Sequence, residues 1–384
     1  MKYLLEYIWL DANDKLRSKI KISYNLDLYS DSDSDSDTND NADTNDNDNS
    51  DLDLDTNSKT KNKNPVPMWN FDGSSTGQAD CSNSDVILKP VKLYQNPFFA
   101  SKTTKTNTNT NMISYIVLCE CLNKDLSPHV TNHRHNCNKM NTKYLATKCL
   151  FGIEQEYVIF ENDKPYKWHT ASDPLPNSAE CVQGEFYCSV GGNKAFGREI
   201  SNKHLLYCLE AGIHICGTNA EVAPSQWEFQ IGTCDMLTVS DDLIVARYIL
   251  DRIAEEHNCF ISLEPKPFGP KWNGSGGHTN FSTGTMREKN GIQYIYEACE
   301  KLKETHTEHM KVYGKDNEQR LTGIHETSSI HDFSYGVADR SCSIRIPLDV
   351  ANKKCGYLED RRPASNLNPY LVTATIVNTV CSSK

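Results

Sequence analysis

The chain has 384 residues, 38% of them hydrophobic and 24% charged, so it can bury a large core and form two or three domains. The formal net charge of −11 comes from one tract, Asp31–Asp55, which holds eleven Asp and no Lys or Arg. Outside that tract the charges cancel. A neutral remainder gives no electrostatic footprint for nucleic acid, so we do not expect a nucleic-acid partner.

The N-terminal segment and the cysteines indicate in which cellular compartment we expect the protein. The opening residues MKYLLEYIWLDAND alternate like a strand and lack the apolar core and cleavage site of a signal peptide. We therefore expect the fifteen Cys to be reduced thiols. No apolar stretch approaches the roughly 20 residues that span a bilayer, so we expect a cytoplasmic protein without a membrane partner.

In chain order, the first predicted elements are strands. Tyr3–Leu10 and Leu16–Tyr24 flank the Asx-rich turn Asp11–Asp14, which is typical of a β-hairpin. Met68–Leu93 is rich in turn signals, and Ser114–Leu122 predicts a buried strand. These segments predict a small sheet domain over residues 1–124.

Two polar runs interrupt this first domain. Residues 30–64 and 101–111 consist almost wholly of Asp, Ser, Asn, Thr and Lys. Such segments have nothing to bury against the entropy of ordering them, so we expect disordered insertions in surface loops. Insertions of this kind cost little, because closure entropy grows only logarithmically with loop length.

Strands and helices alternate in the larger domain, which we place at residues 125–384. The pattern predicts a strand at Phe151–Phe160 and helices at Asn132–Thr147, Ser201–Ala211, Asp241–His257 and Gly291–Val312.

Acidic residues and one histidine form the first chemical pattern. Glu154 and Glu156 lie two apart on a predicted strand, so their carboxylates share a face and repel unless a cation lies between them. Glu221 and Glu228 stand among small and apolar residues, and a Gly-rich loop precedes His278. Imidazole with carboxylates suits Mn²⁺ or Mg²⁺. For the first pair alone, a solvated strand face remains the alternative.

Arginines concentrate in the last third of the chain, in turn-rich segments around Glu359: Arg320, Arg340, Arg345, Arg361 and Arg362. Guanidinium groups suit bidentate recognition of carboxylate and phosphate, and metals with arginines are the parts that phosphoryl transfer requires. Any single Arg has the alternative of a surface ion pair. The hypothesis therefore depends on the whole set.

Seven ordered segments between about Leu4 and Val380 resemble the signature segments of eukaryotic-type glutamine synthetase: WNFDGSSTGQ, FGIEQEY, GTNAEVAPSQWEFQIG, NGSGGHTNFST, RLTGIHETS, ADRSCSIRIP and GYLEDRRP. The resemblance implies an α+β chain with a small β-grasp domain before a larger, guanido-kinase-like catalytic α/β domain. It also implies a homo-oligomer, a decamer of two stacked pentamers, with active sites between neighbouring subunits. The implied reaction joins L-glutamate and ammonia to L-glutamine through γ-glutamyl phosphate, using ATP and two or more Mg²⁺ or Mn²⁺ ions.

The resemblance also assigns site residues. One metal falls to Glu156, Glu221 and Glu228, and the second falls to Glu154, His278 and Glu359. The residues implied to bind glutamate are Trp272, Gly274, Arg320 and Arg361. Those implied to contact ATP or its phosphates are Glu154, Glu228, Asn280, Ser282, Arg340, Arg345 and Tyr357, with Arg340 also stabilising the transferring phosphate.

Two further catalytic residues follow from the same resemblance. Asp72, donated by the adjacent subunit, would attract ammonium and accept its proton. Glu326 would lie on a flap that shields the acyl phosphate from water, as closing loops do generally, although a helix-capping carboxylate is its alternative.

The sequence departs from the family pattern at a few positions. Leu150 replaces an aromatic residue and Lys271 replaces the usual Asn beside Trp272. We also expect the family's N-terminal helical segment to be absent. Two other functions stay open: a related ligase that uses another amine, and an inactive structural relative.

Other histidines have weaker signals. A zinc site at His129, His133, His135 and Cys137 is disfavoured because the spacing does not match a zinc finger. His306 and His309 are predicted to lie on a solvated helix face.

Overall fold

The computed structural model describes residues 2–24, 26, 66–99, 112–168 and 184–382. The two polar runs, residues 30–64 and 101–111, lie outside these residues, and their disorder stays a prediction. Among the described helices, none has both the length and the apolar character needed to cross a membrane.

The first sheet has five strands in the order β2-β1-β5-β4-β3, and only β1 and β5 run parallel. The strands are β1 Lys2–Leu10, β2 Leu16–Ser23, β3 Trp69–Asp72, β4 Asp85–Gln95 and β5 Met112–Leu122. Short 3₁₀ turns follow β3 at Gly73–Thr76 and Cys81–Asn83. The predicted hairpin and the buried strand near residue 114 are confirmed.

Strand β1 buries side chains on both faces of this sheet. Tyr7 and Trp9 belong to a core with Phe71 on one side, whereas Ile8 joins the main core of the molecule. Successive strand residues point to opposite faces, so one strand serves two cores. The first sheet is therefore packed against the rest of the chain through its second face.

The second sheet has nine strands, of which seven follow the order β12-β13-β14-β11-β6-β9-β8, while β7 and β10 pair with β6. The strands are β6 Leu150–Glu161, β7 Lys164–Pro165, β8 Ile215–Ala220, β9 Gln226–Cys234, β10 Phe260–Ser262, β11 Gly277–Ser282, β12 Tyr335–Val337, β13 Ile344–Ile346 and β14 Leu358–Asp360. Long, central β6 confirms the predicted strand.

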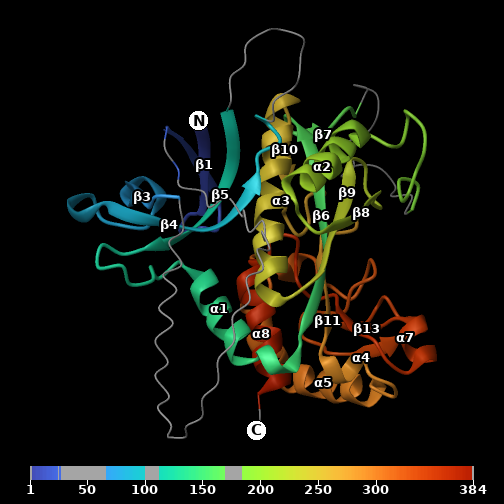
Figure 1. Ribbon diagram of the computed structural model, residues 1–384. Helices are drawn as coiled ribbons and strands as arrows, with labels where there is room; N and C mark the ends of the chain where they lie inside the picture. The colour runs from blue at the N-terminus through green and yellow to red at the C-terminus, as the bar shows by residue number, and fades with distance from the viewer. Residues whose placement is uncertain (1, 25, 27–65, 100–111, 169–183, 383–384) are drawn as a thin grey trace, which may run out of the picture.

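Eight α-helices accompany the sheets in the described residues: α1 His133–Lys143, α2 Arg198–Ala211, α3 Met236–Glu256, α4 Gly284–Arg287, α5 Ile292–Glu304, α6 His306–Met310, α7 Leu348–Lys353 and α8 Pro369–Cys381. Two 3₁₀ turns lie at Leu145–Thr147 and Asn317–Gln319. Figure 1 shows α3 running between the first sheet and the larger one. Its Val239, Leu243 and Ile249 are buried in the core that also holds Ile8 and Ile153.

One predicted helix is divided. The expected helix Gly291–Val312 is two helices, α5 and α6, because Thr305 has φ −108° and its hydroxyl donates to the Lys301 carbonyl. The prediction of a solvated face for His309 is wrong: this side chain is buried between the Tyr313 hydroxyl, 2.6 Å away, and the Thr379 hydroxyl, 2.8 Å away.

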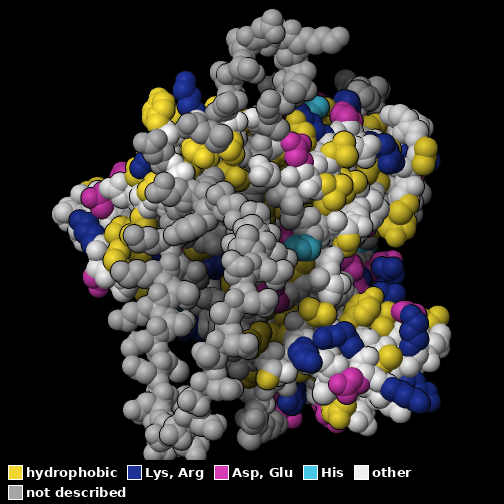
Figure 2. All heavy atoms as spheres, in the orientation of Figure 1, with side chains coloured by type: hydrophobic (Ala, Val, Ile, Leu, Met, Phe, Trp, Pro, Cys, Tyr) yellow, Lys and Arg dark blue, Asp and Glu magenta, His cyan; other side chains and the backbone are white. Residues whose placement is uncertain are grey.

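The described surface carries both charge signs. Figure 2 shows several Lys and Arg side chains over the part of this face that α5 and α7 form in Figure 1, with Asp and Glu side chains among them and elsewhere on the face.

Candidate functional site

Strand register assembles the acidic residues on one face of the large sheet. On the central strand β6, Glu154 is opposite His278 of β11, and Glu156 is opposite Glu228 of β9. Glu359 follows one strand further out, on β14, next to β11. Side chains two apart share a face. Residues from four strands thus meet although they are far apart in sequence.

These residues line a hollow of about 780 Å³. All six predicted metal ligands border it: Glu154, Glu156, Glu221, Glu228, His278 and Glu359. So do six further predicted site residues: Gly274, Arg320, Glu326, Arg340, Arg345 and Arg361. The hollow therefore combines a dense set of carboxylates with four guanidinium groups.

The hollow makes ionisation of three of its glutamates unfavourable. Burial raises the pKa of Glu156 to about 7, that of Glu221 to about 8 and that of Glu228 to about 9, and neighbouring glutamates add to each shift. Burial and the nearby Arg361 lower the pKa of His278 well below its usual value, so its ring is neutral and keeps a lone pair. Carboxylates that repel one another beside a neutral imidazole suit a divalent cation.

The hollow contains two groups of potential metal ligands, and within each group the ligand atoms all lie within 4.8 Å of one another. One is Glu154, His278 and Glu359, the set predicted for the second metal. The other is Glu156, Glu228 and His278, which contains two of the three residues predicted for the first metal. Glu221 borders the same hollow, but its carboxylate accepts from the Asn219 side chain at 2.9 Å and from the Val222 amide.

Two arginines hold Glu359. Arg345 donates to its Oε2 and Arg361 to its Oε1, each at 2.7 Å. Arg361 also donates to the carbonyls of Arg340 and Glu326, so it joins three loops at the rim. Any metal bound at Glu359 would share this carboxylate with both guanidinium groups.

Arg320 lies deeper and is almost fully buried. Its guanidinium donates to the carbonyls of Arg361 and Arg362 and lies 3.2 Å from the His278 Nε2. Burial lowers the pKa of Arg320 to about 10, whereas Glu156 acts in the opposite direction. This cation is therefore fixed in position beside the carboxylates.

A second hollow, of about 370 Å³, adjoins the first and shares Glu154 and Gln230 with it. Three predicted nucleotide contacts, Asn280, Ser282 and Tyr357, border this second hollow. Its other lining residues include apolar side chains of β6 and β9. Asn280 donates to the Glu154 carboxylate at 2.9 Å, which links the two hollows directly.

Two predicted residues do not line the hollows. Asp72, at the end of β3, is exposed and accepts from the amide and hydroxyl of Ser74 and from the hydroxyl of Ser75; these bonds lower its pKa. Trp272 lies buried in an aromatic cluster with Phe186 and Phe268, although the following Asn273 and Gly274 border the first hollow.

Three side-chain amides at the site were not predicted from the sequence: Asn219, Gln226 and Gln230. Gln226 donates to Glu156 at 3.3 Å and to the Gly274 carbonyl at 3.1 Å. Gln230 donates to Glu228 and to Asn219. The signal was present, because Gln226, Glu228 and Gln230 alternate along β9 and therefore share its face. Tyr187 also borders the hollow, and no pattern in the sequence indicated it.

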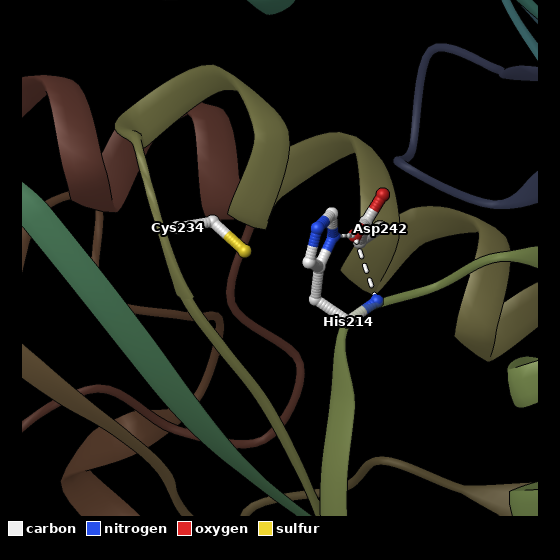
Figure 3. Close-up of side chains that lie close together, drawn as sticks. All are labelled: His214, Cys234 and Asp242. Atoms are coloured by element: carbon white, nitrogen blue, oxygen red, sulfur yellow. Dashed lines mark hydrogen bonds and ion pairs between the residues drawn. The ribbon is translucent and has the colours of Figure 1, made fainter.

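A further group, His214, Cys234 and Asp242, borders neither of these two hollows (Figure 3). Asp242 accepts from the amide and Nδ1 of His214 on one oxygen, and from Lys92 and Tyr94 of β4 on the other. The Lys92 ammonium lies 2.8 Å from the carboxylate and neutralises it. This group therefore joins the first sheet to α3 and is poorly suited to a cation.

Comparison with known proteins decides the family. The family model "Glutamine synthetase, catalytic domain" matches residues 132–310 and 319–382. The chain belongs to the glutamine synthetase family. A glutamine synthetase of Yarrowia lipolytica is 45% identical over 381 residues, which cover 99% of this chain and 91% of that protein.

Two other relatives give the same result. A glutamine synthetase of Eremothecium gossypii is 49% identical over 319 residues, covering 83% of this chain and 82% of the relative. One of Panulirus argus is 49% identical over 321 residues, covering 82% and 84%. The resemblance stated from the signature segments is confirmed.

Proposed function

We propose that this chain catalyses the ATP-dependent ligation of L-glutamate and ammonia to L-glutamine through γ-glutamyl phosphate. The observation that carries the proposal is the first hollow, where six predicted metal ligands and four arginines converge. Relatives with the name glutamine synthetase match most of the chain, which favours this reaction over ligation of another amine and over an inactive structural role.

The carboxylates and His278 fit divalent ions by their chemistry, since buried, mutually repelling glutamates gain most from a bound cation. Residues Glu154, His278 and Glu359 would hold one Mg²⁺ or Mn²⁺, and Glu156, Glu221 and Glu228 would hold another. When bound, such ions neutralise phosphate charge and so favour phosphoryl transfer.

The second hollow would receive the nucleoside part of ATP. Its apolar strand residues suit a planar base, while Asn280, Ser282 and Tyr357 offer polar contacts. The phosphates would then reach the first hollow at Glu154, where Arg340 and Arg345 supply positive charge. This arrangement aims the transferring group at the glutamate site.

Glutamate would bind with Arg320, Arg361 and the backbone at Gly274, beneath which Trp272 packs. Its side-chain carboxylate attacks the phosphoryl group, and ammonia then displaces phosphate. Glu326 would cover the acyl phosphate against water. Asp72 of a neighbouring subunit would take the proton from ammonium.

The finer architecture belongs to the same proposal. The five-stranded first sheet is proposed to be the β-grasp domain, over residues 1–124, with the catalytic domain over residues 125–384. The chain is proposed to assemble into a cytoplasmic decamer of two stacked pentamers, which brings Asp72 to an adjacent active site.

Phosphate release tests the reaction. Purified protein is incubated with ATP, L-glutamate and Mg²⁺ or Mn²⁺, with ammonium, with a polyamine or with no amine. We expect ammonium to give the largest release, with glutamine as the product. Larger release with a polyamine would identify the related ligase, and no release with any acceptor would support an inactive relative.

A further inference from the structure

Two cysteines far apart in the sequence lie together at the end of the C-terminal helix. The sulfur atoms of Cys149 and Cys381 are 3.7 Å apart. Cys149 directly precedes β6, and Cys381 is the last residue of α8. Both side chains are half-buried.

The surrounding contacts hold these two segments in place. The Tyr144 hydroxyl donates to the Asn378 side chain at 3.3 Å, one turn before Cys381. The Lys301 ammonium donates to the carbonyl of Val380 at 2.7 Å. Side chains from α5 and from the end of α1 therefore hold the last turn of α8 in place. The short distance between the two sulfur atoms thus depends on these contacts as well as on α8 itself.

Both thiols can be reached by a small oxidant. Cys149 lines a hollow of about 230 Å³ with Lys148 and Arg287. Cys381 lines a neighbouring hollow of about 470 Å³, which also includes Lys148 and Lys301. Cationic side chains in these hollows favour a thiolate, which is the form that reacts with peroxide.

The two thiols have different chemical roles. The Thr147 hydroxyl lies 3.0 Å from the Cys149 sulfur, and the contact with Cys381 and the nearby Arg287 lower the pKa of Cys149 to about 7. The same contact raises the pKa of Cys381, which remains a thiol. Because Arg287 lines the hollow of Cys149 and not that of Cys381, we assign Cys149 as the nucleophile and Cys381 as the resolving partner.

We propose that Cys149 and Cys381 form a reversible disulfide that fastens helix α8 to the start of β6 when the protein meets a peroxide. The Cys149 thiolate attacks one peroxide oxygen, the O–O bond breaks, and the departing hydroxide takes up the proton that the Cys149 thiol had released, which gives one water and a sulfenic acid. The Cys381 sulfur then attacks that sulfur, its proton joins the departing hydroxide as water, and the S–S bond forms. Two thiols are oxidised and one peroxide is reduced to two waters.

The location gives the bond a structural consequence. Leu150, next to Cys149, lines the second hollow, and the Arg287 guanidinium links the Lys148 carbonyl to the Ser282 hydroxyl. The disulfide would close a loop across most of the catalytic region, and long loops stabilise most in the chain-entropy description. Disulfides in reducing compartments are usually transient and redox-sensing, which agrees with the reversible disulfide proposed here.

Peptide mapping tests the bond. Reduced, full-length protein is treated with hydrogen peroxide, free thiols are alkylated, and the digest is analysed by mass spectrometry without reductant. We expect a Cys149–Cys381 peptide pair that disappears after dithiothreitol, and a rise of about 5 °C in the unfolding temperature of the oxidised protein. Cys259→Ser, a half-buried control elsewhere, should keep both effects.

Single variants separate the two roles. In Cys381→Ser, the sulfenic acid on Cys149 should accumulate and react with a dimedone probe, whereas Cys149→Ser should show neither the bond nor a sulfenic acid on Cys381. Failure to find the linked peptides while other thiols oxidise would overturn the proposal. So would equal dimedone labelling of Cys149 in the wild type and in Cys381→Ser.

Discussion

At the residue scale, charge repulsion decides how the candidate metal site behaves. Glu228 faces Glu156 across neighbouring strands, and both side chains are buried. Such a pair is unfavourable by itself and becomes favourable only with a cation between the carboxylates. Losing one glutamate should therefore harm ligand binding far more than the fold.

Glu228→Ala should lower glutamine formation by roughly 100-fold or more, because even residues that only support metal ligands contribute 10- to 100-fold. Mg²⁺ should raise the unfolding temperature of the wild type and leave that of the variant unchanged. Glu161→Ala, at the exposed end of β6, is the matched control and should behave as wild type. Near-normal turnover of Glu228→Ala at saturating metal would contradict the assignment.

A buried ion pair between Arg362 and Asp360 lies next to Glu359 in the chain. The Arg362 guanidinium donates to both oxygens of Asp360, at 2.8 and 2.6 Å, and both side chains are inaccessible to solvent. Tyr313 donates to the same carboxylate at 2.7 Å. This ion pair holds the short strand β14, which also contains Glu359. Loss of the pair should therefore disturb the active site as well as destabilise the fold.

Arg362→Met should destabilise the protein by about 3–5 kcal/mol, since it leaves Asp360 buried without its counter-ion. Chemical unfolding followed by fluorescence measures the loss. Lys311→Met removes an exposed ion pair with Glu308 and should change stability by less than about 1 kcal/mol. If both variants lost the same small amount, the buried pair would contribute no more than a surface pair.

At the element scale, the packing of α2 on α3 includes a buried histidine. The His204 Nε2 donates to the Ala246 carbonyl at 2.9 Å, and the ring packs against Phe229. Burial lowers the pKa of His204 to about 4. Because the folded state binds the proton more weakly than the unfolded state, the neutral ring favours folding above the unfolded pKa near 6.5, and this contribution is lost as the pH falls towards 4.

His204→Gln should therefore flatten the decline of stability between about pH 6.5 and pH 4, a decline to which His204 contributes at most about 3 kcal/mol. Unfolding midpoints measured at several pH values test this. His257→Gln, at the C-terminal cap of α3, lacks a buried setting and serves as the control. An unchanged pH slope in His204→Gln would show that another group is responsible.

How far the sequence predicts these elements depends on how local their signals are. The first hairpin, β5 and β6 follow from alternating or apolar runs, and the shared face of Glu154 and Glu156 follows from strand period alone. Strands β12, β13 and β14 have three residues each, and only their neighbours in the sheet define them. The division of α5 from α6 likewise depends on Thr305 and on contacts of His309 with distant Thr379.

The site shows the same limit. Individual ligands were recognised through the family resemblance, but the strand order β14-β11-β6-β9-β8, which brings Glu359, His278, Glu154 and Glu228 together, joins segments that are distant in the chain. No local pattern contains that order. The amides of Asn219, Gln226 and Gln230 were missed because amides on a strand are common without a site, even where they share a face with an acidic residue.

At the scale of the whole molecule, the question is which chain supplies Asp72 to each active site. It lies on the first sheet, exposed, and does not border the hollow formed by the described residues of its own chain. If it serves a neighbouring subunit, each active site combines one chain's glutamates with another chain's Asp72. Asp72→Asn keeps the shape of the side chain but removes the charge that would hold ammonium and take its proton.

Mixed assembly tests this arrangement. Asp72→Asn and Glu228→Ala are expected to be inactive in glutamine formation when each assembles alone. When they assemble together in equal amounts, about a quarter of the interfaces should pair an intact Glu228 set with an intact Asp72, so activity should return to about that fraction of wild type. The two proteins mixed after separate assembly, without subunit exchange, are the control and should stay inactive. If Asp72 acted within its own chain, every site would carry one lesion, and co-assembly would restore nothing.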